Sequence, residues 1–200
     1  KVSDKIGVLE HLLGKASVFL IGGAMANTFL RAEGFHLGKS KVQEDKLHLA
    51  RSFLKNAQAL KAEVVLPSDL VVATSLDGPA SVVPATGVQV DQMALDVGPK
   101  TVERFAEIIG KAKTVFWNGP LGLFEKSAFA AGTLGVARAV AACTGVTVVG
   151  GGDSVAAVNE AGVADRVSHI STGGGASLEF VEGKTLPGIA ALQTRGEAAQ

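Results

Sequence analysis

The segment VTVVGGGDSVAAV, residues 146–158, joins a run of β-branched apolar residues to an alanine-rich stretch through three glycines. The first part predicts a buried strand and the last part predicts a helix. Glycine lets bare backbone N–H groups approach an anion closely, and the start of a helix adds a partial positive charge. Glycine also permits tight packing of a helix on a strand. The segment alone therefore leaves two interpretations open, anion binding and close packing.

Two polar residues, Asp153 and Ser154, follow these glycines, and each also has two interpretations. Asp153 can accept a hydrogen bond from a helix N–H as an N-cap. It can also hold Mg²⁺, a hard cation that bridges protein carboxylates and nucleotide phosphates. Ser154 fits the first turn of the helix better than it fits a metal site.

Short apolar runs and helical patterns alternate along the rest of the chain. We expect strands at residues 17–23, 63–67, 69–75, 93–98, 114–120, 146–152 and 168–175. Apolar residues recur at helical spacing in residues 4–15, 25–34, 44–60, 99–112 and 128–145. Strands that are apolar throughout predict burial on both faces, as in a parallel sheet. The alternation therefore predicts an α/β fold with a doubly wound open sheet, interrupted at residues 77–92 by a long loop or small hairpin.

The composition limits the classes of protein. The chain has 200 residues, of which 47% are hydrophobic and 19% charged, enough for the core of one domain or a compact pair. Basic and acidic residues number 19 each, which argues against a non-specific nucleic-acid surface. The single cysteine, Cys143, excludes an internal disulfide and fits a reducing cytoplasm. No apolar run approaches the roughly 18 residues of a membrane helix, and we interpret the chain, which opens at Lys1, as a piece of a longer protein.

Three predicted strands end in glycine-rich turns, at residues 118–122, 150–154 and 172–177. Ligands of open α/β sheets bind beyond the carboxyl ends of the strands. The second and third turns are therefore candidate phosphate-binding turns. Neither contains the GxxxxGK[ST] pattern of a Walker A motif, and no G-x-G-x-x-G pattern follows the first strand. An NAD-binding oxidoreductase domain is therefore disfavoured.

Three further charged residues are candidates for a nucleotide site. Glu125 follows the turn at 118–122 and can accept hydrogen bonds from ribose hydroxyls, or it is a solvated surface acid. Lys1 and Lys5 are four residues apart and share one helix face if the first turn is helical. An anion between them would relieve their repulsion, and two solvated lysines are the alternative.

Six motifs, taken in chain order, resemble phosphoglycerate kinase. They are KVSDKI (1–6), GGAMANTFL (22–30), LDVGPKT (95–101), FWNGPLGLFE (116–125), VVGGGDSVAAV (148–158) and SHISTGGGASLEFVEGKTLPGI (168–189). Several of these motifs are long and unusual, and the resemblance extends to about Leu192. The chain is similar to the C-terminal, nucleotide-binding domain of a bacterial member of this family.

The resemblance implies a monomeric, cytoplasmic glycolytic enzyme that transfers a phosphoryl group between 1,3-bisphosphoglycerate and ADP with Mg²⁺. It implies two Rossmann-like domains joined by a hinge, the N-terminal one binding 3-phosphoglycerate or 1,3-bisphosphoglycerate and the C-terminal one binding ADP or ATP. No nucleic-acid or membrane partner is implied. Residues 1–188 would form a parallel sheet of about six strands with helices on both faces, and residues 189–200 a tail that contacts the N-terminal domain.

The resemblance also assigns roles to individual residues. Lys1 would contact the phosphoryl group in transfer, and Lys5 would hold the nucleotide phosphates. The turn that faces the phosphoryl group in transfer would be formed by Gly173, Gly174 and Gly175. The two walls of an adenine slot would be formed by Gly22 and Gly23 and by Met93, Ala94 and Leu95.

The remaining assignments concern the ribose, the phosphates and the metal. Asn118 and Pro120 would lie next to the ribose and the phosphates, and Glu125 would bind the ribose hydroxyls. Asp153 would be the Mg²⁺ ligand. The turn that binds phosphate and metal would be formed by Gly151, Gly152, Asp153 and Ser154.

The sequence lacks the domain that would hold the phosphoglycerate. We therefore expect a kinase half that binds MgADP or MgATP but is inactive alone, because catalysis needs both substrates aligned and water excluded. The alternative is a non-catalytic folding fragment with weak nucleotide binding. Without the partner domain, Lys1 and the tail at 189–200 are expected to be loose.

Overall fold

The computed structural model describes residues 1–173, 175–187 and 189–190. Its α-helices are α1 (Val2–Leu12), α2 (Gly23–Ala32), α3 (Leu47–Ala59), α4 (Pro99–Lys111), α5 (Ala131–Ala142), α6 (Gly152–Glu160) and α7 (Gly175–Val181). Its strands are β1 (Val18–Leu20), β2 (Glu63–Val65), β3 (Asp69–Ala73), β4 (Ser81–Pro84), β5 (Met93–Val97), β6 (Thr114–Trp117), β7 (Val146–Gly150) and β8 (His169–Ser171). Every predicted strand and helix is present, which confirms the strand and helix alternation.

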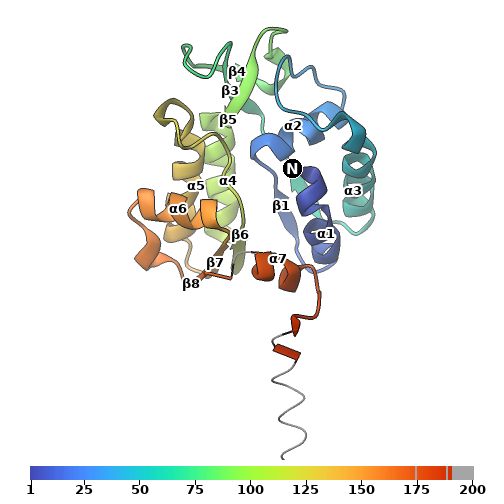
Figure 1. Cartoon of the computed structure of the whole chain (residues 1–200), viewed down its shortest axis with the longest axis vertical. Helices are drawn as coiled ribbons and strands as arrows, with labels where there is room; N and C mark the ends of the chain where they lie inside the picture. The colour runs from blue at the N-terminus through green and yellow to red at the C-terminus, as the bar shows by residue number, and fades with distance from the viewer. Residues whose placement is uncertain (174, 188, 191–200) are drawn as a thin grey trace, which may run out of the picture.

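The fold is α/β with helices on both sides of parallel strands, as predicted. Figure 1 shows α1, α2 and α3 around β1 and β2 on one side, and α4, α5 and α6 around β6, β7 and β8 on the other. The strands do not form the single parallel sheet of about six strands that was predicted, because their hydrogen bonds join them in smaller groups. Strands β1 and β2 form one parallel ladder, and β6, β7 and β8 form another.

A third sheet corrects the expectation for two strands. Strand β3 pairs antiparallel with both β4 and β5, so the strands predicted at 69–75 and 93–98 do not join a parallel ladder. All five residues of β3 are buried, because apolar side chains cover both of its faces. Burial on both faces is therefore no guide to strand direction here. Of the two alternatives for residues 77–92, a long loop or a small hairpin, the structure favours the second, because this range contains β4, which forms an antiparallel hairpin with the preceding β3.

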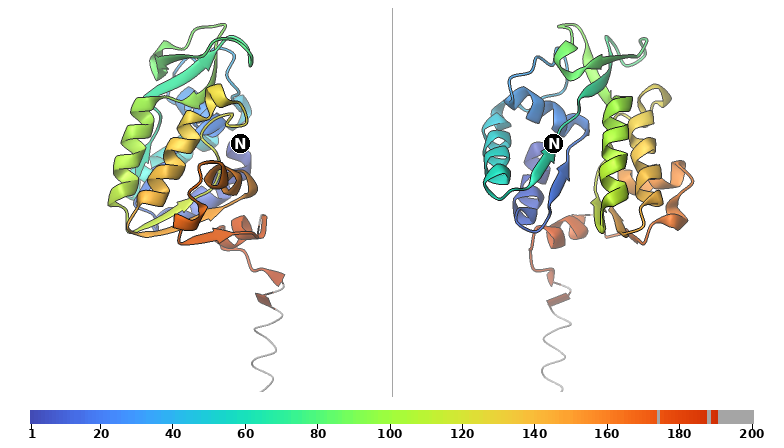
Figure 2. Two further views of the ribbon diagram at one scale, coloured as in Figure 1. Left: turned by 90° about the vertical axis from the view of Figure 1, so that its left-hand side faces the viewer. Right: turned by 180° about the vertical axis from the view of Figure 1, so that it is seen from behind.

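Two large apolar clusters divide the molecule along the chain. The first is built from residues 2–66, and in it Phe53 packs edge-on against Phe19 and Phe29 with ring centroids 5.2 and 5.8 Å apart. The second lies mainly within residues 97–170 and joins α4, α5 and α6 to β6 and β7. The views in Figure 2 show α4 and α5 side by side, with the helices of the first cluster across the molecule.

The two clusters meet through Leu20 and Val65, which pack against the second cluster, and through backbone contacts beyond the carboxyl ends of β1 and β6. Gly23 N donates a hydrogen bond to Leu121 O at 3.0 Å. A Cβ atom on Gly22 would lie 2.8 Å from Leu121 Cγ, and one on Gly23 would lie 2.9 Å from Pro120 O. The φ of Gly23 is +63°, a conformation that favours glycine. Only residues without a side chain allow this approach, which brings the loop after β6 against the start of α2.

A buried carboxylate fixes the start of α4. Asp69, at the start of β3, accepts hydrogen bonds from Lys100 N at 3.0 Å and from Thr101 N at 2.8 Å. The Thr101 hydroxyl donates to Asp69 Oδ1 at 2.6 Å and accepts from the backbone N–H groups of Ser68 and Asp69. These bonds satisfy helix N–H groups that would otherwise lack partners.

Candidate functional site

A pocket of about 250 Å³ opens where the loops after β6, β7 and β8 face α1. It is lined by Lys5, Asn118, Gly119, Gly151, Gly152, Asp153, Ser154, Gly175 and Leu178. Its position beyond the carboxyl ends of parallel strands is the usual ligand site of an open α/β sheet. All of these residues except Gly119 and Leu178 are among the predicted site residues.

The 151–154 turn, from Gly151 to Ser154, forms one wall of the pocket and starts α6. Gly151 is the N-cap with a φ of +90°, and α6 has no side-chain cap hydrogen bond. Asp153 is the second residue of the helix and is exposed, so the alternative role as an N-cap is wrong. The first N–H groups of a helix have no intrahelical partner. The turn therefore presents N–H groups and an exposed carboxylate at the same place.

Ser154 joins the 151–154 turn to the loop after β6. Its side chain is fully buried, and its Oγ accepts a hydrogen bond from Gly119 N at 2.5 Å. The sequence pattern predicts Ser154 in the first turn of the helix but gives no signal for this bond, which links residues 35 apart. The hydroxyl fixes the distance between two walls of the pocket.

Asn118 makes a second link between the same walls. Its Nδ2 donates to Gly150 O at 2.7 Å. Its Oδ1 is buried and has no hydrogen-bond partner within the part of the chain that the structure describes. Buried polar atoms usually have partners, so this oxygen is suited to accept a hydrogen bond from a ligand or a water molecule.

The 118–125 loop, which follows β6, is held at alternate residues. Gly119 N donates to α6 through Ser154, Leu121 N donates to Thr133 Oγ1 on α5 at 3.0 Å, and Leu123 N donates to Leu95 O on β5 at 2.8 Å. Each bond reaches a different element. Three neighbouring elements therefore hold the loop at one end of the pocket. These contacts also determine the positions of Asn118 and Gly119.

Lys5 brings positive charge to the pocket from α1. Burial lowers the pKa of the Lys5 ammonium, and the carboxylates of Asp4 and Asp153 act in the opposite direction by stabilising the charged form. A half-buried ammonium next to a single pocket carboxylate favours anions. Lys1 is exposed and does not line this pocket, so its contact with a phosphoryl group stays a prediction.

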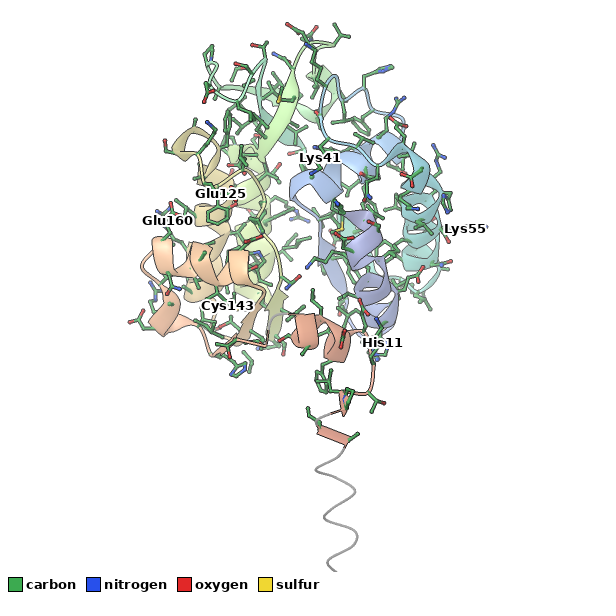
Figure 3. The ribbon with its side chains drawn as sticks, viewed as in Figure 1. His11, Lys41, Lys55, Glu125, Cys143 and Glu160 are labelled. Atoms are coloured by element: carbon green, nitrogen blue, oxygen red, sulfur yellow. The ribbon has the colours of Figure 1, made fainter. Side chains whose placement is uncertain are left out.

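Apart from Asn118, the residues predicted to bind adenine and ribose lie outside the pocket lining. Gly22, Gly23 and Pro120 form the close contact between α2 and the 118–125 loop. The predicted second wall on β5 is half-buried, and consists of Met93, Ala94 and Leu95. Glu125 is exposed, and Figure 3 places it on the half of the molecule that holds α5 and α6, with Lys41 on the other half. The roles of these residues in binding adenine and ribose stay predictions.

The third glycine turn reaches the pocket through α7. Gly175 lines the pocket and starts α7, and a Cβ atom there would meet no atom within 4 Å. Gly173 N donates to Ser171 Oγ at 3.4 Å and its carbonyl accepts from Ala176 N. Gly174 lies outside the described residues. Leu178, one turn further along α7, was missed because only its spacing from Gly175 could have indicated it.

The residues fit a divalent ion that shares its ligands with a nucleotide. Among the described residues, no three His, Cys, Asp or Glu side chains gather into a metal-binding group. Mg²⁺ usually takes one or two carboxylates and completes its shell with substrate phosphates and water. The exposed Asp153 carboxylate at the pocket provides one oxygen donor of this kind.

Among the residues that the structure describes, no helix has the length and apolar character needed to span a bilayer.

Comparison with known proteins places the fold and the sequence in one family. The family described as "Phosphoglycerate kinase" matches residues 1–184. Relatives of that name from Anaeromyxobacter sp. (strain Fw109-5) and Moorella thermoacetica are 56% and 55% identical, over 96% of this chain and 49% of their own length. The chain thus spans about half the length of the curated relatives it matches.

Solved structures agree with the sequence comparison. The structure of phosphoglycerate kinase from Coxiella burnetii superposes with a TM-score of 0.95 at 43% identity, over 98% of this chain and 51% of that chain. The enzyme from Pyrococcus horikoshii gives a TM-score of 0.84 at 34% identity, over 98% of this chain and 50% of that chain.

Proposed function

Because the chain belongs to the phosphoglycerate kinase family, we propose that it is the nucleotide-binding half of such an enzyme and binds MgADP or MgATP. The observation that carries this proposal is the pocket at the 151–154 turn, where helix N–H groups, Lys5 and Asp153 meet. The parent enzyme would transfer a phosphoryl group between 1,3-bisphosphoglycerate and ADP in glycolysis, a cytoplasmic pathway.

The pocket supplies what phosphoryl transfer requires of a protein. This reaction passes through a loose transition state, so it depends on positioning and charge neutralisation more than on a nucleophilic side chain. The N–H groups at the start of α6 would hold phosphate oxygens, and the Lys5 ammonium would balance their charge. Asn118 Oδ1 would accept a hydrogen bond from the bound nucleotide.

Asp153 would hold Mg²⁺ together with the nucleotide phosphates. The ion, when bound, neutralises phosphate charge and fixes the geometry of the phosphate chain. Gly151 and Gly152 would leave room for this arrangement, because a Cβ atom on Gly152 would point into open space. Gly175, which also lines the pocket, would face the transferring group as the start of α7.

We propose that the 200-residue chain is inactive alone. The phosphoglycerate would be held by the second domain of the parent enzyme, and closure of the two domains would align the substrates and exclude water. A coupled assay with MgATP and 3-phosphoglycerate should therefore give no turnover. Turnover by the purified chain, absent from an Asp153→Asn chain purified in the same way, would contradict this part of the proposal.

The test of binding is calorimetric titration with ADP, with and without Mg²⁺. Asp153→Asn should abolish the Mg²⁺ dependence and weaken binding by about tenfold or more, the loss of one charge-assisted interaction. The matched control is Glu160→Gln, which removes one carboxylate from the other end of α6 and should bind as the unchanged chain does. Figure 3 shows Glu160 at that outer end.

Each remaining result of the titration has a meaning. Mg²⁺-dependent binding that persists in Asp153→Asn would show that another residue holds the metal. Absence of ADP binding by the unchanged chain would support the alternative of a folding fragment whose site forms only in the two-domain enzyme.

A further inference from the structure

Asp96 is a buried acid that the pocket does not use. It lies on β5 between the apolar residues Leu95 and Val97, and only 3% of its surface is exposed. Its Oδ2 accepts a hydrogen bond from Gly132 N at 2.7 Å, and its Oδ1 accepts one from Val97 N at 2.9 Å. Burial of a carboxylate is costly unless hydrogen bonds compensate for the lost water. A strand at this position needs no acid for its own pairing.

The carboxylate fills the space between the 118–125 loop and the start of α5. A Cβ atom on Gly122, in the loop, would overlap Asp96 Oδ1, and so would a Cβ atom on Gly132, in the first turn of α5. Both positions are glycine. Asp96 thus contacts the backbone of two segments that lie 26 and 36 residues further along the chain.

The same two segments carry the anchors of the 118–125 loop. Leu121 N donates to the hydroxyl of Thr133, the residue after Gly132. Leu123 N donates to the carbonyl of Leu95, the residue before Asp96. Two of the three loop anchors are therefore chain neighbours of the residues that Asp96 connects. A change in the distance between β5 and α5 would move both anchors together.

We propose that Asp96 is a positioning residue for the nucleotide site, because its carboxylate holds the start of α5 against β5 and thereby fixes the 118–125 loop that carries Asn118 and Gly119. The inference rests on the proposed function, since the site it serves is the proposed nucleotide pocket. Asp96 touches no ligand in this scheme and acts through the loop. A residue with a purely structural role would lower stability and leave the affinity of the folded chain unchanged.

The test compares two buried acids of the same kind. Asp96→Asn keeps the size of the side chain but places an NH₂ group against one of two backbone donors. Asp69→Asn does the same at the start of α4, where the acid is 4% exposed and accepts from Lys100 N and Thr101 N. Helix α4 provides no anchor for the 118–125 loop among the bonds described above, so Asp69→Asn is the matched control.

Both variants are titrated with ADP and Mg²⁺ at a temperature where urea unfolding shows them folded. We expect Asp96→Asn to raise the dissociation constant about tenfold, through the displaced loop, and Asp69→Asn to change it less than about twofold. Equal affinity losses in the two variants, or none in Asp96→Asn, would overturn the proposal. If Asp96→Asn does not fold, Gly122→Ala replaces it, because the added methyl forces the loop away from the same carboxylate.

A measurement without nucleotide separates this inference from the proposed function. Hydrogen exchange at the amides of Leu121 and Leu123 reports the loop anchors directly. We expect Asp96→Asn to speed exchange at both amides by about tenfold or more, and Asp69→Asn to leave them as in the unchanged chain. Unchanged exchange in Asp96→Asn would overturn the positioning role. Loss of ADP binding in the unchanged chain would instead refute the proposed function.

Discussion

Replacement of Gly151 by alanine tests the geometry of the 151–154 turn directly. The φ of Gly151 is +90° with ψ of 139°, a region almost restricted to glycine, so alanine there costs about 1–3 kcal/mol in backbone strain. The new Cβ atom would lie 2.8 Å from Asn118 Nδ2, the atom that donates to Gly150 O. Loss of that bond adds about 1 kcal/mol. The expected loss in the free energy of unfolding is therefore about 2–4 kcal/mol.

Gly162→Ala is the matched control for Gly151→Ala. Gly162 follows the other end of α6 with a φ of +67°, and a Cβ atom there would meet no atom within 4 Å. Strain alone then costs about 1–2 kcal/mol. Urea unfolding of both variants gives the difference, and ADP titration should show a loss of affinity of about tenfold in Gly151→Ala only. Equal destabilisation by the two substitutions would refute the reasoning from the Asn118 contact.

Three further predictions address separate features. Gly152→Ala should leave the free energy of unfolding unchanged or raise it by up to about 1 kcal/mol, because alanine favours a helix and its Cβ atom enters open space. The same substitution should weaken ADP binding in calorimetry, and an unchanged affinity would mean that the phosphates bind elsewhere. Burial raises the pKa of Asp96 to about 6 from 3.8, so the folded chain binds the extra proton between these values. The stability of the unchanged chain relative to Asp96→Asn should therefore fall by about 2 kcal/mol as the pH rises from 4 to 7, measured by urea unfolding. A difference that does not change with pH would contradict the burial argument. Thr101→Val should lower the free energy of unfolding by about 2–4 kcal/mol, because two backbone N–H groups and the Asp69 carboxylate lose their hydrogen-bond partner. A thermal unfolding midpoint equal to that of the unchanged chain would exclude this role of the hydroxyl.

Local patterns in the sequence predicted the strands, the helices and most of the pocket. The glycines at 150–152 and the acid that follows them are a local signal, and the structure brings Gly151, Gly152 and Asp153 to the pocket beside Lys5. The pattern also predicted β3 as a strand. It could not give the direction of β3, because cover on both faces arises in parallel and antiparallel sheets alike.

Local patterns in the sequence could not predict the hydrogen bonds that join distant segments. The hydroxyl of Ser154 and the carboxylate of Asp96 bind backbone groups that are 35 and 36 residues away in sequence. Nothing in the spacing of their neighbours indicates these partners, because such bonds depend on how the helices pack. The resemblance to a family suggested a single sheet of about six strands, whereas the short strands here form ladders of two and three.

The separation of the two large apolar clusters has a consequence for synthesis on the ribosome. The first cluster is complete within residues 2–66, so these residues can collapse before the rest of the chain emerges. Its surface at Gly22 and Gly23 would then stay open until the loop at Leu121 is made. We expect chains stalled once residue 66 has left the ribosome to resist protease within that cluster, and full digestion at this stage would argue for folding only after release. The glycine pair would thus act as a docking point for the later half during translation.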